Sequence, residues 1–327
     1  MAKKSGNTNS VLRSAKVAKN DEFYTQLLDI ENELKHYWKH FTGKTVLCNC
    51  DDPRESMFVK YFFDHFSALG LQRLIATCYK NPSTDLFSTH TAEQSLWLDY
   101  TGEGRTNDEN PDRRKMKAKK FKDDGDFRSD ECIALLKQAD IVCTNPPFSL
   151  FREYVAQLIE YNKSFLIIGN YNAISYKEIF PLIKGNKMWL GYGFSGGNAY
   201  FSIPEDYSNT QIVFVNGKRL CKFRSCCWFT NLDHDKRHEN LELYKTYNPA
   251  EYLKYDHYNA IEVSKTAEIP KDYNGVMGVP LTFLDKYNPE QFEILGDSRY
   301  ITGACFDVNV VNGKTLYRRL LIRRKQE

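Results

Sequence analysis

Apolar runs alternate with stretches of helical periodicity through the first two thirds of the chain. Residues 45–50 and 71–79 are predicted to form buried strands, and the stretch between them repeats apolar residues at helical spacing from Ser56 until Gly70. This order predicts a βαβ unit with a right-handed crossover. Four alternations of this kind predict an α/β fold with a doubly wound, largely parallel sheet. The remaining predicted strands are 141–144, 164–170 and 187–193, and the remaining predicted helices are 27–38, 175–184 and those that start near 129 and 149.

The pattern changes beyond residue 193. The pairs Gly196-Gly197 and Asn216-Gly217 and the apolar run 226–230 are typical of hairpins. We expect their antiparallel strands to complete the large sheet.

Beyond about residue 233 the chain is rich in tyrosine and carries the pairs Arg318-Arg319 and Arg323-Arg324, which predicts a second domain with an aromatic and basic surface. The predicted organisation is a flexible basic arm at 1–20, an α/β domain at 21–233 and a C-terminal domain at 234–327.

The strand at 141–144 stops at Asn145-Pro146-Pro147-Phe148, because proline cannot donate to a ladder. Asn145 is thereby placed at the carboxyl end of a strand, where open α/β sheets bind ligands. The side-chain oxygen of Asn145 and the free carbonyl of Pro146 are two acceptors that suit a planar amino group with two hydrogens. Phe148 offers a flat face on which the ring that carries this amino group can stack. The residues alone leave open a proline-stiffened loop without such a role.

Charged residues nearly cancel over the whole chain. The 45 Lys and Arg stand against 42 Asp and Glu, so a nucleic-acid surface must come from local clusters. The sharpest cluster is the run 113–120, inside a polar stretch at 80–122 that we interpret as an insertion over the edge of the sheet. We expect the run to face phosphate groups. The basic arm at 1–20 fits a contact with phosphates and a solubilising tail equally well.

Other residue types exclude further classes of protein. Nine cysteines without a Cys-x-x-Cys pair indicate a reducing cytoplasm. His234 and His238 lie four residues apart but lack the zincin glutamate and a third ligand nearby, so no metal site is expected. No stretch has the length and apolarity of a membrane span or a signal peptide, so no membrane partner is expected.

Five blocks of the sequence, in their order, resemble the EcoRI-type adenine-specific (N6) DNA methyltransferase family. They lie at 21–26, 48–54, 125–129, 144–154 and 273–280. The resemblance implies a Rossmann-like doubly wound methyltransferase sheet, a C-terminal target-recognition region, S-adenosylmethionine as cofactor and double-stranded DNA as partner. Gln26 departs from the proline that many amino-methyltransferases have after Phe-Tyr-Thr. The turn at 51–56 lacks their glycines, but the EcoRI-type family itself has Asp-Pro-Arg there.

The resemblance also implies a role for individual residues. The implied catalytic residues are Asn145, Pro146, Pro147 and Phe148. The implied cofactor-binding residues are Phe23, Tyr24, Thr25, Asp51, Asp52, Pro53, Ser56, Asp126 and Phe127. The basic run adds Arg113, Arg114, Lys115, Lys117, Lys119 and Lys120 as expected DNA contacts.

The implied activity is site-specific methylation of N6 of an adenine that is flipped out of the duplex. The expected setting is restriction-modification, a phage or a mobile element, in the cytoplasm of a prokaryotic cell. A cognate restriction endonuclease that acts on the same site without direct contact fits this setting, and the oligomeric state is left open. Two alternatives stay open as well: a methyltransferase of another amino group, such as cytosine N4, RNA adenine or protein glutamine, and an inactive DNA-binding relative.

Overall fold

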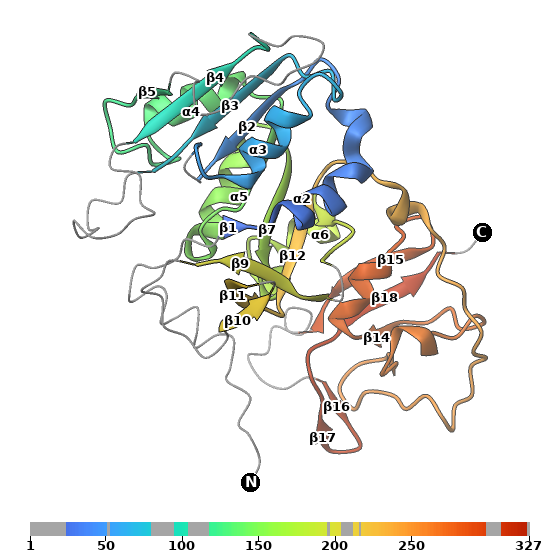
Figure 1. The fold of residues 1–327 in the computed structure, drawn as a ribbon. Helices are drawn as coiled ribbons and strands as arrows, with labels where there is room; N and C mark the ends of the chain where they lie inside the picture. The colour runs from blue at the N-terminus through green and yellow to red at the C-terminus, as the bar shows by residue number, and fades with distance from the viewer. Residues whose placement is uncertain are drawn as a thin grey trace. The chain divides into compact units, whose positions relative to one another are not determined.

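The computed structural model describes residues 24–50, 53–79, 95–103, 118–194, 197–203, 212–215, 217–298 and 309–325. The chain divides into two compact units (Figure 1). Unit 1 comprises residues 1–180 and 190–232, and unit 2 comprises residues 181–189 and 233–327.

An eight-stranded mixed sheet dominates the fold. Its order is β5 (Ala118–Lys120), β4 (Leu96–Tyr100), β3 (Arg73–Thr77), β2 (Thr45–Asn49), β6 (Ile141–Thr144), β7 (Ser164–Asn170), β12 (Cys226–Thr230) and β8 (Trp189–Leu190). Strands β3, β2, β6 and β7 pair in parallel. Strand β4 is antiparallel to β3, β5 is antiparallel to β4, and β12 is antiparallel to β7. The α/β prediction is therefore confirmed, but only the centre of the sheet is parallel.

Helices follow the strands largely where the periodicity predicts them. They are α2 (Leu27–Leu34), α3 (Met57–Asp64), α4 (Asp130–Gln138), α5 (Phe151–Glu160) and α6 (Phe180–Lys184), with 3₁₀ turns η1 (Lys35–His40), η3 (Phe148–Leu150) and η4 (Tyr171–Ser175). Ser56 caps α3 by accepting a hydrogen bond from the N–H of Val59 at 3.4 Å. Ser129 caps α4 in the same way, with the N–H of Cys132 at 3.3 Å. Ser149, near which a helix is predicted to start, lies inside η3 because the chain already turns at Phe148, and α5 starts at Phe151 without a side-chain cap.

Side chains of the central strands alternate between two buried faces. Val46 and Leu74 pack into one core cluster with residues of α2 and α3. Their neighbours Leu47 and Ile75 are equally buried and point to the opposite face. Burial on both faces explains why these strands are continuous apolar runs in the sequence.

A second, four-stranded sheet contradicts part of the hairpin prediction. Its order is β1 (Tyr24–Thr25), β9 (Ala199–Ser202), β11 (Lys218–Phe223) and β10 (Ile212–Val215), with every pair antiparallel. Of the strands predicted to complete the large sheet, only β12 joins it, against β7. The others form a separate sheet because β9 pairs with β1 near the start of the chain, a contact that local turn signals cannot reveal.

Three predicted segments differ in extent. The described parts of 80–122 are β4 and β5, which extend the large sheet as edge strands although the sequence there shows little periodicity. The strand predicted at 187–193 is only β8. The helix predicted at 175–184 starts at Phe180, since Pro181 in its first turn has no N–H with which to continue a helix from earlier residues.

Unit 2 has a sheet and an apolar core of its own. The sheet order is β13 (Ile261–Glu262), β14 (Met277–Val279), β18 (Leu320–Arg324) and β15 (Phe292–Asp297), and β16 (Val310–Val311) pairs with β17 (Lys314–Thr315). Its 3₁₀ turns are η6 (Asp235–His238), η7 (Thr266–Glu268) and η8 (Leu281–Lys286). The rings of Phe283 and Phe292 are fully buried and lie 5.2 Å apart, edge to face.

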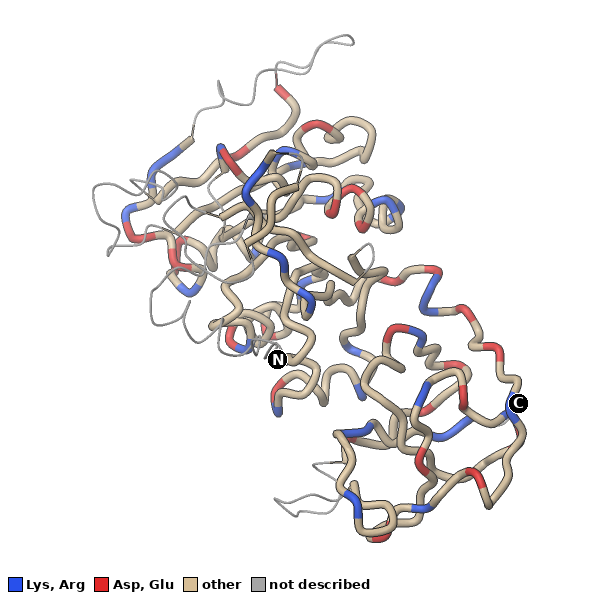
Figure 2. Tube along the Cα trace, turned by 60° about the horizontal axis from the view of Figure 1, so that its bottom comes forward, with Lys and Arg blue, Asp and Glu red and all other residues tan. Residues whose placement is uncertain are grey.

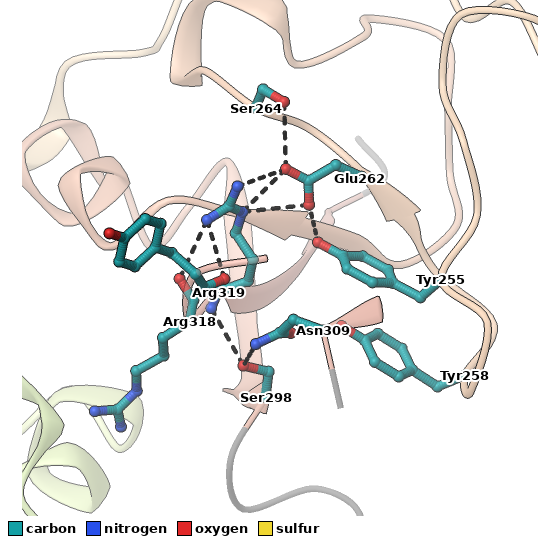
Figure 3. Close-up of polar contacts among 9 residues, drawn as sticks. Tyr255, Tyr258, Glu262, Ser264, Ser298, Asn309, Arg318 and Arg319 are labelled. Atoms are coloured by element: carbon teal, nitrogen blue, oxygen red, sulfur yellow. Dashed lines mark hydrogen bonds and ion pairs between the residues drawn. The ribbon is translucent and has the colours of Figure 1, made fainter. Parts of the chain in front are cut away.

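Two arginines of unit 2 bind buried carboxylates and do not form the predicted basic surface. Figure 3 shows one of them, Arg319, on Glu262. Arg319 binds the carboxylate of Glu262, with Nη2 at 2.7 Å from Oε1, and both side chains are largely buried. The hydroxyl of Tyr255 donates to the same carboxylate. Arg318 pairs with Asp297, whose side chain is fully buried. Each guanidinium therefore compensates a buried carboxylate, which would be costly to leave unpaired.

Basic and acidic residues are interspersed along both units (Figure 2).

In the described part of the chain no helix is long and apolar enough to cross a membrane. Within the same residues no three His, Cys, Asp or Glu side chains gather into a metal-binding group. The eight described cysteines form no disulfide with one another.

Candidate active site

The order of strands reverses beside β2. The chain passes from β2 through α3 to β3 on one side, and it returns to β6 on the other side of β2. The hydroxyl of Thr144, at the end of β6, donates a hydrogen bond to the backbone carbonyl of Asn49, at the end of β2. The two carboxyl ends are thus tied together at a switch point, which is where open α/β sheets bind ligands.

Residues 145–148 start where β6 ends. Asn145 and Pro146 are buried, and Pro147 and Phe148 are half-buried. The N–H of Leu150 donates to the carbonyl of Pro147 at 3.0 Å, so the chain turns at once into η3 and α5. Because neither proline can extend the ladder, the amide of Asn145 is held at the carboxyl edge of the sheet, as the sequence predicts.

The loop after β2 is strained at Cys50. Its φ is 87°, in the left-handed region that residues other than glycine rarely adopt, at a cost of roughly 1–3 kcal/mol. Pro53 and Ser56 follow it and are buried. The structure therefore brings these two predicted cofactor residues to the switch point. Asp51 and Asp52 lie outside the described residues.

Gly125 places the next segment beside the carboxyl end of β3. Its φ is +77°, and a Cβ atom there would lie 2.3 Å from the carbonyl oxygen of Cys78, the residue that follows β3. Only glycine allows this approach. Since β3 is parallel to β2, Asp126 and Phe127 are brought to the same edge of the sheet as Asn145.

The carboxylate of Asp126 is held by Arg128. Its Oδ1 accepts hydrogen bonds from the backbone N–H and Nε of Arg128 at 2.8 and 2.9 Å, and Oδ2 accepts one from Nη2 at 2.7 Å. These bonds hold the pKa of Asp126 below its ordinary value, so the group stays ionised. Nη1 of Arg128 also donates to Glu153 of α5 at 2.9 Å. A carboxylate oxygen accepts two hydrogen bonds, so Oδ2 of Asp126 keeps capacity for a ligand.

Helix α5 contacts both the end of β2 and the segment at 125–127. The ring of Phe127 lies 5.1 Å from the ring of Tyr154, edge to face, and Gln157 donates to the carbonyl of Phe127 at 3.0 Å. The hydroxyl of Tyr154 donates to the side-chain oxygen of Asn49. Burial raises the pKa of Tyr154, which keeps this hydroxyl protonated.

Phe127 therefore has a packing role in addition to its predicted contact with a cofactor. It is 8% exposed, and the guanidinium carbon of Arg128 lies 5.2 Å from its ring centroid. A planar ligand could reach this ring only along its remaining exposed part or after Arg128 moves.

Strand β1 is linked to Phe148 through contacts of β9 and β11. Thr25 pairs with Phe201 in β9. The ring of Phe201 lies 5.4 Å from that of Phe223, and Phe223 lies 6.5 Å from Phe148. This chain of contacts places the described part of the predicted Phe23-Tyr24-Thr25 element in the same region as the catalytic segment.

Thr25 has the properties of a ligand-binding residue. It is 2% exposed, and its Oγ1 has no hydrogen-bond partner among the described residues. A buried hydroxyl normally has a partner, so this one fits a polar group of a bound molecule. Gln26, in place of the usual proline, donates to the hydroxyl of Ser202 at 2.9 Å and so ties β1 to β9. Phe23 and the side chain of Tyr24 lie outside the described residues.

Two of the predicted DNA contacts, Lys119 and Lys120, lie on the edge strand β5 and are exposed. The Nζ of Lys119 lies 4.4 Å from the ring centroid of Trp97, its cross-strand partner in β4, a cation–π contact. Arg113, Arg114, Lys115 and Lys117 lie outside the described residues.

Asn49, Arg128, Thr144 and Tyr154 complete the site, although no sequence motif assigns them a role. One feature of the sequence could have predicted the role of Tyr154. It stands on the apolar face of a predicted helix, and a buried tyrosine hydroxyl normally finds a hydrogen-bond partner.

Comparison with known proteins identifies the family. The sequence profile of the family described as "Adenine-specific methyltransferase EcoRI" matches residues 11–325. The chain belongs to this family. It is 49% identical over 324 residues to the Type II methyltransferase M.EcoRI of Escherichia coli, with 98% of each chain covered. No solved structure matches it.

Two mycoplasma proteins extend this comparison. The Type II methyltransferase M.MgeORF184P of Mycoplasma genitalium is 40% identical, with 95% of this chain and 98% of the relative covered. The Type II methyltransferase M.MpnI of Mycoplasma pneumoniae is 38% identical, with 95% and 97% covered. The family predicted from five sequence blocks is confirmed, and with it the predicted class of function, that of a methyltransferase of the EcoRI family.

Proposed function

We propose that the chain is a site-specific DNA methyltransferase that moves a methyl group from S-adenosylmethionine to N6 of an adenine in double-stranded DNA. The proposal rests chiefly on Asn145 and its two prolines, which leave the carboxyl end of β6 at the switch point. The hydrogen bond from Thr144 to Asn49 ties this point to β2, and the chain belongs to an adenine-specific methyltransferase family.

The proposed organisation follows from this activity. A Rossmann-like doubly wound catalytic domain covers 21–233, and a target-recognition domain covers 234–327. The basic insertion at 80–122 contacts phosphate groups, with Lys119 and Lys120 as its described basic residues.

Residues at the sheet edge fit S-adenosylmethionine. When bound, this cofactor supplies a methyl group on a sulfonium centre that is its own leaving group. The buried hydroxyl of Thr25, the ionised carboxylate of Asp126 and the loop that contains Pro53 and Ser56 supply acceptors and a rigid frame for it. Phe23, Tyr24, Asp51, Asp52 and Phe127 are assigned to the same site by their place in the family motifs.

Asn145 acts on the nucleophile. N6 of adenine is a poor nucleophile because its lone pair is shared with the ring. The side-chain oxygen of Asn145 and the carbonyl of Pro146 accept hydrogen bonds from its two hydrogens, which favours a pyramidal nitrogen with the lone pair aimed at the methyl group. A paired base cannot reach this site, so the adenine is flipped out and stacks on Phe148.

The proposed setting is a prokaryotic cytoplasm, where the protein works on DNA in a restriction-modification system or on a mobile element. A cognate endonuclease would act on the same site without contact with this chain.

The test is transfer of labelled methyl groups from S-adenosylmethionine to DNA, RNA and protein, followed by nucleoside analysis. The expected product is N6-methyldeoxyadenosine. N4-methyldeoxycytidine, or label in RNA or protein, would assign another amino group. DNA binding without transfer to any polymer, and without cofactor binding in calorimetry, would identify an inactive relative.

A further inference from the structure

The β10–β11 hairpin exposes an apolar strand. All four residues of β10 are apolar, and β10 is the edge strand of its sheet. Ile212 packs against the core, but Phe214 is 74% exposed and Val215 is 40% exposed. Natural proteins protect such edges because they pair with other chains. The exposed strand therefore points to a partner that covers it.

The neighbouring strand is basic. Lys218 and Arg219 of β11 stand directly opposite Val215 and Phe214. Residues 212–224 also include Lys222 and Arg224 and contain no acidic residue. Cations beside an exposed aromatic ring are a combination that suits DNA, because the cations neutralise phosphates and the ring can make apolar contacts with base edges.

Strand β11 links the proposed catalytic segment to the hairpin. Figure 1 shows β10 and β11 beside β9. At one end of β11, Phe223 contacts Phe148, with ring centroids 6.5 Å apart. Arg219, opposite Phe214, precedes Phe223 by four residues, which is roughly 14 Å at about 3.4 Å per residue. Since bases along a DNA strand rise by about 3.4 Å per step, this distance corresponds to about four base pairs.

We propose that the β10–β11 hairpin contacts duplex DNA about four base pairs from the target adenine. Phe214 makes an apolar contact with the base edges, and Lys218 and Arg219 lie on the phosphates. A two-stranded ribbon fits the major groove. The inference rests on the proposed function, because it takes duplex DNA as the substrate, and it adds a contact outside both the basic run at 113–120 and the region 234–327.

Photocrosslinking tests the contact directly. Phe214 is replaced by p-benzoylphenylalanine in the full chain, which is bound with cofactor to a duplex that holds the recognised site. Crosslinks are expected at nucleotides about three to five positions from the methylated adenine. The control carries the same amino acid in place of Trp38, which is 40% exposed in η1. Since η1 ends just before β2 starts, this position lies at the amino edge of the sheet and should give no site-specific crosslink.

Two substitutions test the energetics. Phe214→Ala should raise the Kd for the duplex about fivefold or more and leave the Kd for S-adenosylmethionine unchanged. Phe214→Trp keeps a flat apolar ring and should bind within about twofold of the wild type. Lys218→Gln should weaken binding to all sequences alike and lower the salt slope by about one.

The outcomes separate this inference from the proposed function. If the wild type methylates DNA, while Phe214→Ala binds the duplex unchanged and no crosslink forms, the hairpin contact is wrong and the function stands. If Phe214→Ala turns a dimer into a monomer in sedimentation, with unchanged DNA affinity, the strand is a self-association surface and the contact is again wrong. If the wild type methylates no DNA, the proposed function fails, and the hairpin contact fails with it, because the contact is defined relative to the methylated adenine.

Discussion

Tyr154 donates the hydrogen of its hydroxyl to the side-chain oxygen of Asn49, and both residues are buried. Its ring also contacts Phe127, so one side chain of α5 connects the end of β2 with the segment at 125–127, which lies beside the carboxyl end of β3. The same helix follows directly on the segment that holds Asn145. This contact explains how three segments far apart in the sequence keep one geometry at the edge of the sheet.

Removal of this hydroxyl should loosen the cofactor site. Tyr154→Phe keeps the ring but leaves the buried amide of Asn49 without its donor, which should lower the free energy of unfolding by about 1–3 kcal/mol. The KM for S-adenosylmethionine should rise several-fold, with kcat much less affected, because the loop after β2 belongs to the proposed cofactor site. Tyr161→Phe, at the end of the same helix, is the matched control. Unchanged KM in Tyr154→Phe would show that the contact has a structural role alone.

Asp29 should make the stability of the protein depend on pH. Burial raises its pKa from 3.8 to about 6, opposed in part by a hydrogen bond from the backbone of Tyr200. Between these two pH values the folded protein binds more protons than the unfolded chain, so stability falls as the pH rises through this window.

Asp29→Asn should therefore raise the free energy of unfolding at pH 7 by about 1 kcal/mol, after allowance for partial solvent exposure. The gain should vanish below about pH 4, as urea denaturation across this range can measure. Asp130→Asn, an exposed aspartate in the first turn of α4, is the control and should give no gain. An equal gain for Asp29→Asn at every pH would mean that the carboxylate is not the cause.

Local signals were sufficient for the centre of the fold. The helix starts near Ser56 and near residue 129 and the strand end at the two prolines after Asn145 depend on signals within a few residues, so the sequence predicts their positions. Parallel strands then meet at one edge by the rules of α/β topology.

Contacts between residues far apart in the sequence could not be predicted. The partner of β9 is β1, and the partner of Tyr154 is Asn49, and no local pattern encodes either pair. The pair Arg318-Arg319 shows the same limit, because a sequence does not tell whether an arginine faces solvent or a buried carboxylate.

The lysines of β5 should contribute to DNA binding without sequence preference. Lys119→Gln together with Lys120→Gln should weaken binding to every duplex and reduce the salt slope by about two. Lys137→Gln is the control, because this exposed lysine near the end of α4 lies towards the amino edge of the sheet. An altered site preference with an unchanged salt slope would contradict the phosphate role.

Phe148 should stack on the flipped adenine. We expect 2-aminopurine at the target position to brighten when the protein and cofactor bind, and a mismatch opposite the target to tighten binding. Phe148→Ala should make flipping less complete, at a cost of about 1–3 kcal/mol, whereas Phe148→Tyr keeps a ring and serves as control. The ring already contacts Phe223. Quenched fluorescence in an active complex, with wild-type behaviour of Phe148→Ala, would leave it as a packing residue only.

The central claim is that the side-chain oxygen of Asn145 accepts a hydrogen bond from the amino group that is methylated. The most direct measurement is the single-turnover rate of N6-methyladenine formation for the wild type, Asn145→Ala and Asn145→Asp, with cofactor affinity measured by calorimetry. We predict that Asn145→Ala loses roughly a hundredfold or more in rate while its Kd for S-adenosylmethionine stays within a few-fold. Asn145→Asp keeps an acceptor and should retain more activity than Asn145→Ala. An Asn145→Ala enzyme that retains a tenth or more of the wild-type rate would contradict this role.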